Sequence, residues 1–144
     1  EHIDDDVSAM REIRRMLKPG GTAFLMVPAG RGLFDYYDEL HCHVRRYEKV
    51  EFRDKIKSSG LRVLGLNFLG VSLYPAFYIV KKYGRWKMRG KTTAEKREQV
   101  MREVGRSSNS VMAGFIIEME RRLEGQLTWP RGIRLYAHVA RGDT

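Results

Sequence analysis

The chain has 144 residues, of which 42% are hydrophobic and 31% are charged, and this is the ordinary composition of one globular domain. Its single cysteine, Cys42, excludes an internal disulfide framework and fits a reducing compartment, so we expect a cytoplasmic protein. The longest uncharged apolar run, residues 68–80, is shorter than the about 20 residues that a membrane-spanning helix needs.

The net charge of +9 is unevenly distributed along the chain. Residues 81–106 hold ten Lys or Arg against three Glu, which is a local charge of +7. Such an excess fits the solvated face of a helical region, and it also fits an anionic partner or an anionic membrane surface. We do not expect a nucleic-acid partner, because no recognised nucleic-acid-binding motif accompanies the charge.

The first part of the chain predicts a helix and then a strand. Residues 4–6 are aspartates, which cap a helix and place negative charge at its amino end. Apolar residues then recur at helical spacing as far as Leu17, and residues 19–21, Pro-Gly-Gly, end the helix. Residues 23–27 form a continuous apolar run, which is typical of a strand covered on both faces in a parallel sheet.

The middle of the chain repeats this alternation of helix and strand. Residues 33–47 predict a loop rich in polar and aromatic side chains. Residues 50–59 predict a helix, which Gly60 ends, and residues 61–68 alternate loosely as a second strand. This alternation favours an α/β fold.

The remainder of the chain predicts a helical insertion followed by a last strand. Residues 93–104 predict a charged helix and residues 109–124 an amphipathic one, whereas residues 133–140 alternate as a strand. We expect the insertion, about residues 70–124, to lie to one side of the sheet. Its apolar beginning, residues 68–86, predicts either a basic amphipathic lid or a helix packed on the sheet edge.

Four segments, in order along the chain, carry recognisable motifs: Glu1-His2-Ile3 with Asp5-Asp6, Arg11 to Gly21 ending in Leu17-Lys18-Pro19-Gly20-Gly21, Asp38-Glu39 with His43-x-Arg45-Arg46-Tyr47, and Pro130-x-Gly132 with Leu135 and Ala140-Arg141. Together they resemble the C-terminal half of a class I S-adenosylmethionine-dependent methyltransferase of the small bacterial type 11/12-like branch. The resemblance covers residues 1 to about 141.

This resemblance implies a partial Rossmann-like methyltransferase sheet, with residues 1–144 as the C-terminal part of one domain. The sheet would keep its last three strands in the order 22–27, 133–140, 61–68, with the last strand antiparallel between the others. The family's glycine-rich turn and ribose-binding carboxylate are not among these residues, so we expect a truncated chain that binds S-adenosylmethionine poorly alone. A strand without its outer neighbour also predicts a homo-oligomer or a rearranged packing.

The resemblance implies three groups of site residues. The cofactor cleft would be lined by Glu1, His2 and Ile3. Removal of a proton from the acceptor would be the task of His43 or Tyr47. The loop residues that contact substrate or close over it would be Tyr36, Tyr37, Arg45 and Arg46. The alternative is that Arg45 or Arg46 pairs with Asp38 or Glu39 and only holds the loop in place.

The sequence His41-Cys42-His43 could suggest a metal site, but three adjacent side chains cannot all face one ion in a strand. We therefore expect no metal there. The expected activity of the intact protein is methyl transfer from S-adenosylmethionine to a small or lipid-like acceptor. The alternative is a non-catalytic binding or assembly module, peripheral to the membrane, whose basic insertion meets an anionic membrane surface or partner.

Overall fold

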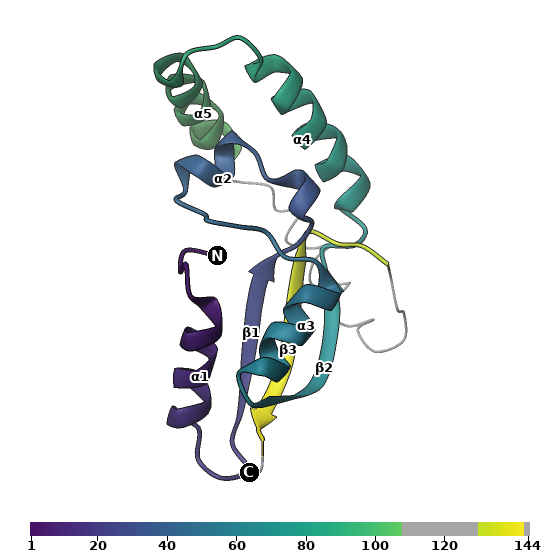
Figure 1. Ribbon diagram of the computed structural model, residues 1–144. Helices are drawn as coiled ribbons and strands as arrows, with labels where there is room; N and C mark the ends of the chain where they lie inside the picture. The colour runs from purple at the N-terminus through teal and green to yellow at the C-terminus, as the bar shows by residue number, and fades with distance from the viewer. Residues whose placement is uncertain (108–129, 143–144) are drawn as a thin grey trace.

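The computed structural model describes residues 1–107 and 130–142, which form a mixed α/β structure with one three-stranded sheet (Figure 1). In chain order the elements are α1 (Asp6–Met16), β1 (Thr22–Pro28), the short 3-10 helix η1 (Arg31–Leu33), α2 (Tyr36–Leu40), α3 (Lys49–Ser58), β2 (Leu61–Leu69), α4 (Tyr74–Met88), α5 (Thr93–Ser107) and β3 (Arg134–Arg141). The α/β class expected from the sequence is confirmed.

The sheet has the order β1-β3-β2, and β3 is antiparallel to both of its neighbours. In this register Ala137 lies opposite Leu25 of β1 and Leu66 of β2. Since both outer strands oppose β3, β1 and β2 run in the same direction. The strand order and the direction of the last strand are therefore as the sequence predicted.

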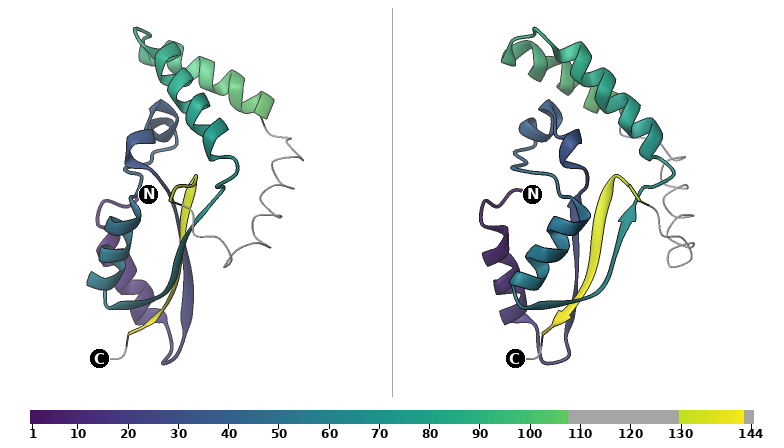
Figure 2. Two further views of the ribbon diagram at one scale, coloured as in Figure 1. Left: turned by 90° about the vertical axis from the view of Figure 1, so that its right-hand side faces the viewer. Right: turned by 45° about the vertical axis from the view of Figure 1, so that its right-hand side comes forward.

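Helices α1 and α3 cover one face of this sheet (Figure 2). Phe52 and Ile56 of α3 are fully buried there, together with Leu135 and Val139 of β3. Burial of each such side chain stabilises the fold by about 2 kcal/mol, so this layer is the main hydrophobic core.

The prediction that β1 is covered on both faces is wrong. The side chains on its other face, Phe24 and Met26, are 73% and 50% exposed. Phe24 stacks on the ring of His138 in the neighbouring strand, with centroids 4.5 Å apart. A continuous apolar run does not reveal which side chains another layer will reach, whereas an antiparallel sheet can leave one face open.

Helices α4 and α5 lie beyond one end of the sheet, next to η1 and α2, rather than along a sheet edge (Figures 1 and 2). The charged helix predicted from residue 93 is confirmed as α5. The helix predicted over residues 109–124 lies outside the described residues. None of the helices in the described part is long and apolar enough to cross a membrane.

Candidate functional site

The loop between β1 and α3 is organised around the buried carboxylate of Asp38, which is 2% exposed. Arg46 donates to it from Nε at 2.9 Å, and Nη2 of the same side chain lies at 2.8 Å. The backbone N–H of Asp35 donates at 3.0 Å, and His43 Nδ1 lies 3.0 Å from Asp38 Oδ1. Three residues of the loop thus share one anion.

Lys81 of α4 brings a second element to this anion. Its Nζ lies 2.6 Å from Asp35 Oδ1 and 3.2 Å from Asp38 Oδ2. We call Asp35, Asp38, His43, Arg46 and Lys81 the Asp38 cluster. Burial by itself would raise the pKa of Asp38, but the hydrogen bonds from Arg46 and Asp35 and the charge of Lys81 outweigh it and hold that pKa well below its usual range. Asp38 is therefore ionised and can only accept hydrogen bonds.

The local sequence explains why α2 forms at this point. Asp35 caps the helix, because its side chain accepts a hydrogen bond from the N–H of Tyr37, and Asp38 returns a bond to the N–H of Asp35. Arg46 also donates to the carbonyl of Ala29 at the end of β1, at 3.2 Å. The cluster therefore joins the loop to the sheet as well as to α4.

A cavity of about 530 Å³ lies between the loop and α4, beside the Asp38 cluster. Its apolar wall comes from Tyr37, Phe77, Val80, Tyr83 and Met88. His43 and Arg46 are among its polar lining residues. We call this space the α4 cavity; it offers an apolar chamber with an imidazole in its wall.

The first residues of the chain meet the same loop. The N–H of Val44 donates to the carbonyl of Glu1 at 2.6 Å, and His2 Nδ1 lies 3.1 Å from the carbonyl oxygen of Cys42. The rings of His2 and His43 make an edge-to-face contact with centroids 4.8 Å apart. The segment predicted to bind cofactor and the loop predicted to bind acceptor are thus neighbours.

Tyr47, predicted as an alternative base, lies in the core instead. Its ring packs on Phe52, and its hydroxyl donates to Asp6 Oδ2 at 2.7 Å. Burial, followed by this hydrogen bond, raises the pKa of Tyr47 far above its usual range. Burial would also raise the pKa of Asp6, but bonds from Lys55 and Tyr47 lower it overall. Tyr47 is not among the residues that line the α4 cavity.

The two arginines of the loop differ in their partners. Arg46 pairs with Asp38, as one of the two alternatives expected. Arg45 pairs with neither Asp38 nor Glu39; it donates to Asp6 Oδ2 at 3.0 Å and to the carbonyl of Asp4 at 2.8 Å. The pairing expected of one of these arginines is therefore made by Arg46, whereas a residue 39 positions away supplies the carboxylate for Arg45.

The two tyrosines of α2 are also placed apart. Tyr36 donates its hydroxyl to the carbonyl of Thr93 at 3.0 Å, and Lys96 lies over its ring. These contacts join α2 to α5. Tyr37 lines the α4 cavity and is the tyrosine of this pair that faces the candidate acceptor space.

Sequence reasoning missed the central roles of Asp38 and Lys81. A signal for the first was present, since Asp35 and Asp38 have the spacing of a capping box. The signal for Lys81 was its helical spacing from Phe77 and Met88, which places it on the same helix face as these two apolar residues. What the sequence could not supply was the fold that brings them together.

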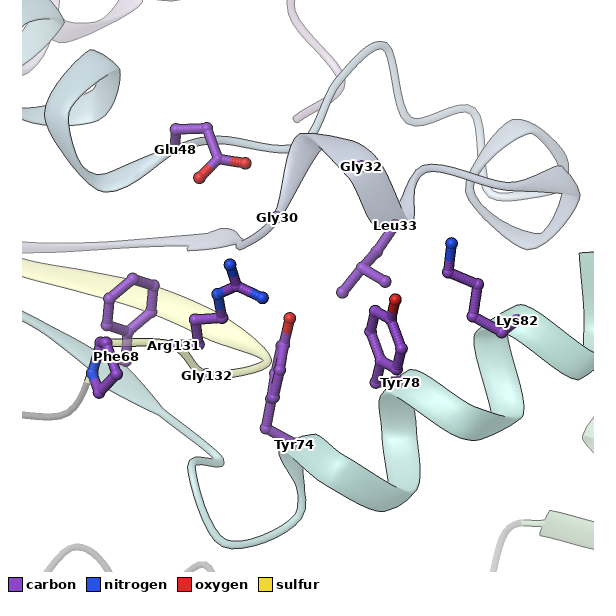
Figure 3. Close-up of a pocket in the computed structure, with 11 residues that line it drawn as sticks. Gly30, Gly32, Leu33, Glu48, Phe68, Tyr74, Tyr78, Lys82, Arg131 and Gly132 are labelled. Atoms are coloured by element: carbon purple, nitrogen blue, oxygen red, sulfur yellow. The ribbon is translucent and has the colours of Figure 1, made fainter.

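A second cavity, of about 320 Å³, lies at the start of α4 (Figure 3). Tyr74, Tyr78 and Lys82 line it from successive turns of that helix, and Arg131 points into it from the chain before β3 (Figure 3). It contains none of the residues predicted for catalysis or cofactor binding.

Comparison with protein-family models finds no match for this chain, and comparison with curated proteins finds none either. The family resemblance therefore depends on the four sequence motifs.

Proposed function

We propose that residues 1–144 belong to an S-adenosylmethionine-dependent methyltransferase whose acceptor is a small or lipid-like molecule. The observation that carries this proposal is the contact between Glu1 and Val44, at 2.6 Å, with His2 beside His43. Reacting atoms must approach to about 3–3.5 Å, so cofactor and acceptor residues have to adjoin in such an enzyme. Two separate sequence motifs predicted these roles: one motif predicted cofactor binding and the other predicted acceptor binding.

The sheet topology supports the same proposal. An antiparallel strand β3 between the parallel strands β1 and β2 is the arrangement expected for the last three strands of a methyltransferase sheet. In this interpretation the sheet is part of a larger Rossmann-like one, and the α4–α5 region is its helical insertion.

The acceptor would occupy the α4 cavity, whose apolar wall suits an aromatic or lipid-like molecule. Asp38 holds His43 by Nδ1, and a carboxylate can only accept, so the neutral imidazole carries its hydrogen on Nδ1. The lone pair of Nε2 is then the one that can take a proton from an acceptor hydroxyl. Asp38 orients His43 as this base, whereas Tyr47 packs in the hydrophobic core.

The described residues do not make a complete cofactor site. Gly30-Arg31-Gly32 follows β1, but Gly30 only precedes η1 (Arg31–Leu33), a helix of three residues, rather than the long helix of a cofactor-binding turn. Glu1, His2 and Ile3 would form one wall of the cleft. We infer that the remaining contacts to the cofactor come from a part of the protein other than these residues.

Isothermal titration with S-adenosylmethionine tests this proposal on two chains. One is residues 1–144, and the other is the same chain extended by whatever sequence its gene encodes upstream. We expect no measurable binding by the first and binding by the second. Tight binding by residues 1–144 would contradict the inference that most cofactor contacts come from another part of the protein. Absence of binding by an extended chain would contradict the assignment to the methyltransferase family.

A second candidate function is binding to an anionic membrane surface, and the outer face of α4 favours it. Ile79 and Trp86 are each 66% exposed, and Lys82 stands beside them on the same helix. Apolar side chains that insert and basic ones that meet phosphate are the features of an interfacial helix. Arg131 and Lys82 in the second cavity add to this positive surface.

Co-sedimentation with phosphatidylserine vesicles tests this second candidate. We expect binding that weakens as salt is added, and that Trp86→Ser abolishes. Met101→Ser is the matched control, because Met101 is an equally exposed apolar residue on α5. Equal loss with both variants, or binding to nucleic acid rather than vesicles, would count against a specific α4 surface.

A further inference from the structure

Glu1, His2 and His43 bring one potential metal-binding atom each to the same place. These atoms all lie within 4.8 Å of one another. Two of the residues begin the chain and the third lies in the loop after α2, so the fold assembles the group from distant parts of the sequence. This group differs from the His41-Cys42-His43 run, in which the rings of His41 and His43 are 6.2 Å apart.

Both imidazoles are oriented by a bond at the same ring nitrogen. His2 Nδ1 lies 3.1 Å from the carbonyl oxygen of Cys42, and His43 Nδ1 lies 3.0 Å from Asp38 Oδ1. A carbonyl and an ionised carboxylate only accept, so Nδ1 carries the hydrogen in each neutral ring. The lone pair of each Nε2 is therefore left for another ligand.

Metal-binding histidines in proteins generally have hydrogen bonds of this kind at the ring nitrogen that does not bind the metal. A histidine ligand donates its other ring N–H to a carboxylate or a backbone carbonyl, which fixes the tautomer and the ring direction. His2 has the backbone carbonyl of Cys42 as its acceptor, and His43 has the buried carboxylate of Asp38. The outer contacts are thus already formed in the protein alone.

We propose that Glu1, His2 and His43 form a binding site for a divalent transition-metal ion such as Zn²⁺. Two imidazoles and one carboxylate suit such ions, and three protein ligands leave a fourth position for water or another molecule. Zinc–ligand distances of about 2.1 Å require the donors to close to about 3.4 Å. The side chain of His2 is exposed, so it can make most of this movement by turning about its bond to the Cys42 carbonyl.

The metal site does not depend on the proposed methyltransferase function, because zinc binding can be measured without S-adenosylmethionine. The two roles of His43 exclude each other at any moment, since Nε2 has one lone pair. An upstream-extended chain that binds zinc but not the cofactor would support the metal site and weaken the family, and the reverse result would do the opposite.

Isothermal titration of residues 1–144 with zinc chloride is the test. We expect one zinc ion per chain, with binding weakened at least tenfold by His2→Gln and by Glu1→Gln. His41→Gln is the matched control, because His41 is adjacent to the site in sequence but outside it, and should leave the affinity unchanged. Thermal unfolding of each variant without zinc confirms that the fold is retained.

Histidine ring signals in an NMR titration give a second readout. Zinc should shift the Cε1–H resonances of His2 and His43 and leave those of His41 and His138 in place. A chain with one extra residue before Glu1, which removes a free α-amine from this position, should bind equally well. No zinc binding, equal weakening by His41→Gln, or dependence on a free α-amine would each overturn the proposal.

Discussion

Lys81 Nζ lies 2.6 Å from the Asp35 carboxylate and so joins α4 to the capping residue of α2. Both side chains are almost fully buried, with Lys81 8% and Asp35 9% exposed. This contact fixes where α4 stands above the loop, and with it the shape of the α4 cavity.

Replacement of Lys81 by methionine should therefore destabilise the protein. Removing one partner of a buried ion pair leaves the other charge uncompensated, which costs about 3–5 kcal/mol. Urea unfolding at neutral pH measures the loss. Lys82→Met is the control, because Lys82 is exposed, and it should change the free energy of unfolding by less than about 0.5 kcal/mol. Equal effects of the two substitutions would show that Lys81 does not anchor α4.

Stability should fall in acid because of Asp38. Its pKa is lower in the folded protein than the about 3.9 of an unfolded aspartate, so its contribution is fully present above that value. The contribution is lost as the pH falls below about 4 towards the folded pKa. Urea midpoints between pH 7 and pH 2 should show this decline. Asp38→Asn should lower stability at pH 7 and flatten the decline, whereas Asp54→Asn, at an exposed site, should do neither.

Tyr47 should show the opposite dependence on pH. Its raised pKa means that its contribution is complete below about pH 10, the pKa of an unfolded tyrosine, and is lost as the pH rises towards the folded value. Tyr47→Phe should cost about 1–2 kcal/mol at pH 7, because Asp6 loses a buried donor. Ultraviolet titration should show one tyrosine that ionises only with unfolding, and the variant should lack it.

The homo-oligomer predicted from the sequence can be tested at the open face of β1. In the sheet of the described residues β1 is an edge strand, and Phe24 is exposed on it. Light scattering should give a mass above that of one chain, and Phe24→Lys should reduce it, since charge on an edge strand opposes pairing. Val80→Lys on α4 is the comparison. A monomeric wild-type chain would contradict the prediction, and dissociation by Val80→Lys alone would move the interface to α4.

The sequence predicted the parts of this structure that depend on local pattern. Helix ends followed from residues such as Gly60, which adopts a positive φ of 82° where α3 has ended. Strand order followed from the family resemblance. The coverage of Phe24 was predicted wrongly and the partner of Arg45 was not predicted, because both depend on which distant segment packs against them. The joining of Lys81 to Asp35 has the same origin, since 46 positions separate the two residues.

The pairing of β2 with β3 also determines how freely the helical region can change. Leu69 and Arg134 lie opposite each other, and the N–H of Ile133 donates to the carbonyl of Leu69 at 2.9 Å. The α4–α5 region is thus inserted at a single point of the sheet, between Leu69 and Arg134, where a two-residue hairpin turn could take its place. Such a module can be exchanged, lengthened or removed in a descendant gene without altering the register of the strands that carry it.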